Sequence, residues 1–332
     1  MIEVIEAVQP LIPVFVFSLP RSGSTLLQRI LATHPRVATA SEPWILLPFL
    51  YARRKNGVYA EYGHRKAIKA FEDFTAGLSG GDAEYLRAVE DLALRLYRDR
   101  AGPRARFFVD KTPRYHVVSA DIVRAFESGR FIFLWRNPLA IVASMVEVWG
   151  HGRWNAYEFE FDLYDGLEGL LEARELAGDR AISIRYSDLI AESPETRAKV
   201  FSYLGLQIGE AEPASQQSVV LNGRMGDQAG ARAYRDLSRE PVTKWKQTLA
   251  SPLRKLWCRR YLRWIGRERL AAMGYDLDVL LRELREAPIR WRTVPSDAWR
   301  MLFGYAVRLL EPWIVRDKLS GLRHGLRMRA HA

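Results

Sequence analysis

The chain has 332 residues, 48% of them hydrophobic, and a formal net charge of +11. This length and apolar fraction allow a large buried core and exclude an intrinsically disordered chain. A single cysteine, Cys258, excludes an internal disulfide framework, and no Cys/His spacing is typical of a metal site. The sequence therefore predicts a globular protein of a reducing compartment with a metal-free site.

The first predicted elements are a strand, a tight turn and a helix within residues 14–28. Backbone N–H groups at such a helix start, together with the helix dipole, favour a bound phosphate or sulfate. Compared with the nucleotide-binding pattern G-x-x-x-x-G-K-[ST], Ser18 replaces the first Gly and Ser24 replaces the Lys. The nearest cation is Arg21, whose planar fork suits an oxyanion. The alternative is a turn whose serines only cap the helix.

Two short strands are predicted next, on either side of a charged helical insertion at about 50–105. The first strand ends at Glu42, before a Pro-directed turn, and the second ends at Asp110 and Lys111. Both side chains are expected at the carboxyl edge of the sheet. The alternatives are a capping or salt-bridged Glu42, and a Lys111 that is exposed or paired with Asp110.

A second strand, turn and helix are predicted around Arg136. Residues 131–135 are apolar and β-prone, and Asn137 and Pro138 then begin a helical pattern. Ser144 follows Arg136 by about two helical turns, so both can approach one anion at the sheet edge. Two anion sites imply a ligand with two separated phosphate groups.

The remaining pattern completes an α/β fold. Strand-like and helical runs alternate along the chain. This alternation predicts three layers around a central, mostly parallel sheet with a P-loop-like turn. We expect an α/β domain at 1–285 and a basic, amphipathic, helical C-terminal extension at 286–332.

Residues 19–25, 136–144 and 182–206 together resemble the sulfotransferases that use 3′-phosphoadenosine 5′-phosphosulfate (PAPS) and release 3′-phosphoadenosine 5′-phosphate (PAP). The resemblance extends over about 13–275. It implies that the 5′ side of the donor is bound by Arg21, Ser22, Gly23, Ser24 and Thr25. It also implies Arg136 and Ser144 at the 3′-phosphate and Tyr186 near the adenine; the alternative for Tyr186 is a core tyrosine at a strand end.

The sequence is closer to the tyrosylprotein and glycan branches of this family than to the cytosolic phenol branch. It lacks the Arg-Lys-Gly cluster with which the cytosolic branch binds the 3′-phosphate. The Gly-rich, basic segment 223–232 resembles the gating loop of the other branches. Arg224, Arg232 and Lys244 are therefore candidate donor ligands, and a solvated basic loop is the alternative.

The resemblance also implies roles in catalysis. Glu42 is the candidate base for the acceptor hydroxyl, and His116 is the second candidate. Lys111 is expected to stabilise the leaving oxygen and Arg21 the charge of the transferred group. The acceptor is expected to be a hydroxyl of a saccharide, a lipid, a natural product or a tyrosine, and no metal is needed.

Positive charge is concentrated near the C-terminus. Residues 244–332 contain 20 Lys or Arg and 8 Asp or Glu, whereas residues 1–243 contain 30 and 31. Such a segment predicts peripheral membrane contact, self-association, or docking on its own domain. No signal or anchor is recognised at the N-terminus, so a cytoplasmic location, with membrane-peripheral attachment as an alternative, is expected.

Two other classes remain as alternatives. A P-loop nucleotide kinase would explain one anion site, but it would need the missing lysine and Mg²⁺. A nucleic-acid-binding protein would explain the charge, but the basic residues alternate with Trp and Leu and no recognised binding fold is present. We therefore expect no nucleic-acid partner.

Overall fold

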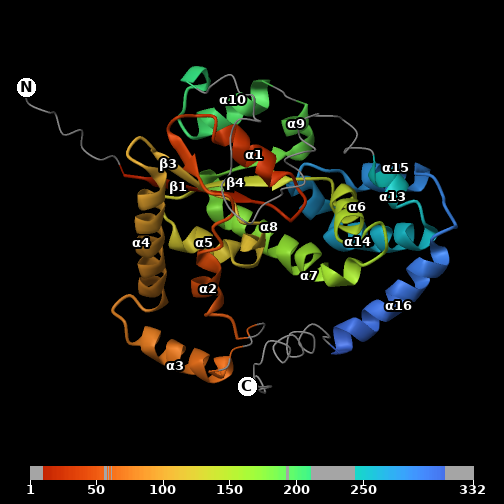
Figure 1. Ribbon diagram of the computed structural model, residues 1–332, viewed down its shortest axis with the longest axis horizontal. Helices are drawn as coiled ribbons and strands as arrows, with labels where there is room; N and C mark the ends of the chain where they lie inside the picture. The colour runs from red at the N-terminus through yellow and green to blue at the C-terminus, as the bar shows by residue number, and fades with distance from the viewer. Residues whose placement is uncertain are drawn as a thin grey trace, which may run out of the picture. The chain divides into compact units, whose positions relative to one another are not determined.

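The computed structural model describes residues 10–55, 58, 60, 62–191, 194–210 and 244–310. They contain a five-stranded sheet with the strand order β2-β3-β1-β4-β5, and every strand pair is parallel (Figure 1). The predicted α/β class with a parallel sheet is confirmed. The strands are β1 (Ile12–Phe17), β2 (Val37–Thr39), β3 (Phe107–Asp110), β4 (Arg130–Trp135) and β5 (Ala181–Arg185).

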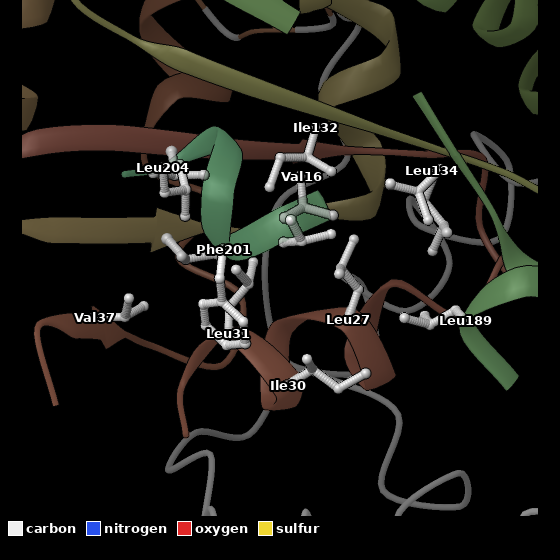
Figure 2. Close-up of a cluster of buried hydrophobic side chains, with 14 of the residues drawn as sticks. Val16, Leu27, Ile30, Leu31, Val37, Ile132, Leu134, Leu189, Phe201 and Leu204 are labelled. Atoms are coloured by element: carbon white, nitrogen blue, oxygen red, sulfur yellow. The ribbon is translucent and has the colours of Figure 1, made fainter. Parts of the chain in front are cut away.

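One face of the sheet packs on helices that follow β1 and β5. Alternate residues of a strand point to opposite faces, and Val14 and Val16 of β1 point to this one. They pack with Leu27 and Phe201 in a cluster of buried aliphatic and aromatic side chains (Figure 2). The helices that contribute to this cluster are α1 (Ser24–Leu31), α9 (Tyr186–Ile190) and α10 (Pro194–Tyr203).

The opposite face is covered mainly by aromatic rings. Phe15 and Phe17 of β1 stack with Phe131 of β4, and Phe126 meets Phe15 edge-on. Phe126 is the C-cap of helix α5 (Ser119–Ala125). Tyr97 of helix α4 (Asp82–Ala101) stacks on a phenylalanine ring of β3 on the same face of the sheet. Because both faces are buried, the strands are continuous apolar runs, as all-parallel sheets require.

The strand register brings the carboxyl ends of four strands to one edge. Phe15 is paired with Asp110, Phe17 with Phe133, and Thr39 with Val109. The residues just after β1, β2, β3 and β4 therefore lie along the same edge, which is where open α/β sheets bind their ligands.

The chain divides into two compact units. The sheet unit comprises residues 1–47, 86–136 and 166–240, and a second unit comprises residues 48–85, 137–165 and 241–332. Helix α8 (Asp165–Ala177) lies in the sheet unit almost entirely. The second unit contains all but the first two residues of α2 (Leu46–Tyr51). Its other α-helices are α3 (His64–Ala76), α6 (Pro138–Val148), α7 (Glu160–Leu163), α13 (Trp245–Thr248), α14 (Pro252–Ala272), α15 (Leu277–Glu286) and α16 (Val294–Leu310).

The division into two compact units does not fall between residues 285 and 286. The domain boundary predicted there from the sequence stays a prediction. The predicted insertion at about 50–105 is helical where it is described, with α3 and α4 at its centre. None of the helices in the described part of the chain combines the length and the apolar composition that crossing a membrane would need.

A buried ion pair joins α14 to α16 within the second unit. Arg254 donates from Nη2 to Asp297 Oδ1 at 2.8 Å and from Nε to Oδ2 at 3.0 Å. Its guanidinium also donates to the carbonyl oxygens of Thr248 and Gly152. Both charged side chains are almost completely buried, so each depends on the other for compensation of its charge.

Replacing Asp297 with Ala leaves the Arg254 guanidinium buried without its counterion. We expect the free energy of unfolding, measured by urea titration with circular dichroism, to fall by about 3 kcal/mol. Asp278→Ala is the matched control, because it breaks the exposed 2.8 Å pair between Arg267 and Asp278, and its effect should be much smaller. Equal losses in the two variants would contradict the assignment.

Candidate active site

The turn between β1 and α1 has a backbone that only glycine fits at one position. Gly23 is the N-cap of α1, with φ 89° and ψ 18°, and Arg21 in the same turn has φ 67°. A Cβ atom on Gly23 would lie 2.4 Å from Cε2 of Tyr186, far inside van der Waals contact. The close approach of this turn to α9 therefore requires the absence of a side chain.

Arg21 and Arg136, the two predicted anion ligands, meet beside this turn. Arg136 follows β4, and its Nη1 donates to the carbonyl oxygen of Arg21 at 2.5 Å. Its guanidinium lies over the Tyr186 ring, 4.5 Å from the centroid. The pKa of the Tyr186 phenol is raised, because the effect of burial exceeds the opposite effect of the positive charges of Arg136 and Arg21. Tyr186 thus belongs to the core and to this cluster of cations at once.

Two hydroxyl groups of the turn are buried without a hydrogen-bond partner among the described residues. They are Oγ of Ser18 and Oγ of Ser22, and these residues are 3% and 1% exposed. Ser24 and Thr25, in the first turn of α1, are also buried. A buried polar group without a partner is costly, and its presence is explained when a ligand supplies the hydrogen bond.

Glu42 and Lys111 form a nearly buried ion pair at the ends of β2 and β3. Lys111 Nζ lies 2.7 Å from Oε1 of Glu42 and 3.3 Å from Oγ1 of Thr25. The other carboxylate oxygen of Glu42 accepts from the indole nitrogen of Trp44 at 3.1 Å. The structure therefore brings together three residues that the sequence analysis assigned to one site: Glu42, Lys111 and Thr25.

Helix α1 fixes the segment before Glu42 through Gln28, which the sequence analysis did not single out. Nε2 of Gln28 donates to Oγ1 of Thr39 at 2.7 Å and to the carbonyl oxygens of Ala40 and Ser41 at 2.6 and 3.2 Å. Gln28 is completely buried, so these bonds also satisfy its amide nitrogen. A polar residue among the apolar positions of the predicted helix was the available signal.

Asp110 is the second residue that the sequence analysis did not assign to the site. Its buried carboxylate accepts hydrogen bonds from Tyr97 at 2.5 Å, Tyr115 at 2.9 Å and Thr112 at 3.1 Å. Burial raises the pKa of Asp110 to about 6, although these hydrogen bonds and the charge of Lys111 lower it. Asp110 is thus a buried carboxyl group directly before the lysine of the site.

The hydroxyl groups of Thr112 and Tyr115 also bind the backbone of the segment that follows Glu42. Oγ1 of Thr112 accepts from the backbone N–H of Trp44 at 3.2 Å, and the Tyr115 hydroxyl accepts from the N–H of Leu46 at 3.3 Å. Trp44 has φ 59°, a conformation that costs energy for a non-glycine residue and that surrounding contacts must maintain. The Asp110 cluster therefore positions Glu42 and Lys111 relative to each other.

The other predicted site residues are placed as follows. The buried ring of His116 packs against α8, where a Cβ on Gly166 would lie 3.1 Å from ring atoms. Ser144 is partly buried in α6, and Lys244 is the exposed N-cap of α13. Arg224 and Arg232 lie outside the described residues. Their roles stay predictions.

No metal-binding group is found in the part of the chain that the structure describes, since no three His, Cys, Asp or Glu side chains lie close enough together. The single cysteine, Cys258, is buried in α14, and burial raises the pKa of its thiol.

Sequence comparison finds a matching family model and two similar proteins. A family model described as the Sulfotransferase family matches residues 13–210. The chain is 32% identical to the nodulation protein NoeE of Sinorhizobium fredii over 138 residues, which are 41% of this chain but only 31% of NoeE. It is 23% identical over 250 residues to a Caenorhabditis briggsae protein described as "Putative protein-tyrosine sulfotransferase", covering 73% of this chain and 84% of that protein.

Structure comparison agrees with the fold. The sulfotransferase domain of the olefin synthase from Synechococcus PCC 7002 has a TM-score of 0.50 and 22% identity. The match covers 73% of this chain and 89% of that domain. At this identity the likeness shows the fold alone.

The raised pKa of Asp110 makes the stability of the protein depend on pH. Its folded pKa of about 6 exceeds the ordinary value of 3.8, so the native state binds the proton first as the pH falls. Relative to Asp110→Asn, the wild type should therefore gain about 1 kcal/mol of unfolding free energy between pH 7.5 and pH 5. Urea titrations of both proteins at the two pH values measure this gain.

Tyr97→Phe provides the control for the pH dependence. It removes a hydrogen bond that lowers the pKa of Asp110, so the gain should begin at a higher pH in this background. A difference between wild type and Asp110→Asn that does not change with pH would show that the carboxyl group does not titrate in this range.

Proposed function

The chain belongs to the sulfotransferase family, and we propose that it transfers a sulfuryl group from PAPS to a hydroxyl group of an acceptor. The observation that supports this most strongly is the hydrogen bond from Arg136 to the backbone of Arg21. It joins the ends of β4 and β1, so two arginines from distant parts of the sequence lie at one edge of the sheet. A donor with phosphate groups at both its 3′ and 5′ positions needs two neighbouring anion sites.

The residues of the turn fit the 5′ side of this donor. The unpartnered hydroxyl groups of Ser18 and Ser22 can donate to anionic oxygens. Gly23 lets the backbone approach closely, and the N–H groups of the first turn of α1, at Ser24 and Thr25, have no partner within the helix. These features suit a phosphosulfate group better than an uncharged ligand.

Arg136 is the proposed ligand of the 3′-phosphate. Its stacking on Tyr186 and its bond to the Arg21 carbonyl fix the plane of the guanidinium, which suits bidentate binding of an oxyanion. Tyr186 is proposed to lie near the adenine. The further proposed contacts of the same donor are Ser144, Arg224, Arg232 and Lys244.

The ion pair at the ends of β2 and β3 is suited to the transfer step. When bound, PAPS supplies a sulfuryl group joined to a phosphate leaving group. Glu42 accepts the proton of the acceptor hydroxyl, whose oxygen forms the new bond to sulfur. Lys111, charged and almost without water around it, stabilises the oxygen that leaves, and Arg21 stabilises the charge of the transferred group. His116 is the second candidate base.

The acceptor is proposed by class only: a saccharide, a lipid, a natural product or a tyrosine. The two sequence relatives are described as "Nodulation protein NoeE" and "Putative protein-tyrosine sulfotransferase", so their names do not agree on an acceptor. A nucleotide kinase is disfavoured because Ser24 stands where phosphate-binding loops have lysine. The cytoplasmic location and the self-association predicted from the sequence stay predictions.

Glu42→Gln tests the proposed chemistry. The amide is isosteric but cannot accept the proton, so turnover from labelled PAPS should fall by roughly 10²–10⁴-fold. The acceptor is first identified with the wild type in a screen of saccharides, lipids, phenols and tyrosine peptides. PAP binding, measured by calorimetry, should change little, because Glu42 is not a proposed ligand of the nucleotide.

Glu172→Gln is the matched control, since Glu172 is an exposed residue of α8 paired with Arg124. It should leave turnover and PAP binding unchanged. Near-normal turnover by Glu42→Gln would move the role of base to His116, and failure of the wild type to bind PAP would refute the proposed donor.

A further inference from the structure

Helix α16 exposes a row of large apolar side chains to solvent. Trp299, Leu302 and Tyr305 are 69%, 67% and 66% exposed, and Phe303 is 46% exposed. The inner side of the same helix, with Asp297 and Gly304, is buried against α14 and the short helix η2 (Ala156–Glu158). A helix that is apolar on its outer side as well as its inner side is unusual in a monomer and marks an interaction surface.

The neighbouring outer side of α14 is strongly basic. This helix contains seven Lys or Arg residues and a single Glu, and all the cations except Arg254 and Lys255 lie outside its buried side. Arg259, Arg260 and Arg263 are exposed and form no ion pair with another described residue. No ion pair within the described residues therefore offsets their positive charge.

A recess connects the apolar and the basic side chains. It has a volume of about 110 Å³, and its lining includes Leu256 and Arg260 from α14 with Met301 and Tyr305 from α16. Trp154 and Trp257 line it as well. The recess is thus lined by Tyr305 of the exposed row and by Arg260 of the basic helix, together with the acidic Glu160. We call the exposed apolar and basic residues of the two helices, Leu256, Arg259, Arg260, Arg263, Trp299, Leu302, Phe303 and Tyr305, the aromatic–basic surface.

We propose that the aromatic–basic surface docks on an anionic phospholipid membrane. Trp, Leu, Phe and Tyr side chains suit the boundary between headgroups and acyl chains, and arginines beside them attract anionic headgroups. The arginines disfavour a second copy of the chain, because a symmetric contact would place like charges opposite each other. They also disfavour coverage by residues 311–332, which contain five Lys or Arg, two acidic residues and two His.

Sedimentation of the full chain with vesicles tests this proposal. Binding is expected to phosphatidylcholine vesicles that contain phosphatidylglycerol, and not to phosphatidylcholine alone. Arg259→Glu with Arg263→Glu should weaken it by at least about tenfold, and the effect should shrink as salt screens the charges. Trp299→Ser with Leu302→Ser should weaken it by about tenfold at every salt concentration.

The matched controls change exposed residues that are not part of the aromatic–basic surface. Arg98→Glu with Arg100→Glu changes exposed arginines of α4, and Phe74→Ser changes a 70% exposed aromatic residue of α3. Both should bind vesicles as the wild type does. PAP binding by all variants should stay unchanged, because the membrane proposal does not depend on the proposed reaction.

Three results would overturn the proposal. One is a wild type that does not sediment with anionic vesicles. Another is that the variants of the aromatic–basic surface bind anionic vesicles as tightly as the control variants do. The third is a dimer, detected by light scattering, that Trp299→Ser with Leu302→Ser converts to a monomer, since a second copy would then be the occupant.

Discussion

The site depends on the contact between a turn and a ring that leaves no room for a side chain. Gly23 lies so close to Tyr186 that even a Cβ atom would collide with the ring. The same ring supports the guanidinium of Arg136, which in turn bonds the backbone of Arg21. One aromatic side chain from the end of β5 thereby sets the spacing between the turn after β1 and the arginine after β4. The contact with this ring and the hydrogen bond between the two arginines together fix the turn relative to Arg136.

A second constraint is the compensation of buried charge beside this turn. Glu42, Lys111 and Asp110 lie at the ends of β2 and β3, where water is nearly excluded. Lys111 is paired with Glu42, and Asp110 is satisfied by hydroxyl groups rather than by a second cation. Such an arrangement is stable only when every member has its partners. The chemistry proposed for Glu42 and Lys111 therefore requires the surrounding polar network as much as the two residues themselves.

The sequence predicted the strands and the turn because their signals are local. Apolar runs that end in Arg21, Lys111 and Arg136 place these residues at strand ends, and the rules for parallel sheets place the ends at one edge. The roles of Gln28 and Asp110 could not be predicted, because each depends on which distant groups meet it in three dimensions. The same holds for α16: its apolar spacing indicated a helix, but only packing decides which side is buried.

The most direct test of the account is calorimetric binding of PAP and of adenosine 5′-phosphate, which lacks the 3′-phosphate. The wild type should bind PAP at least about tenfold more tightly. Arg136→Met should abolish this preference and leave a measurable affinity for adenosine 5′-phosphate, because the turn around Gly23 remains. Equal affinity of the wild type for the two nucleotides would contradict the account, since Arg136 would then not recognise the 3′-phosphate.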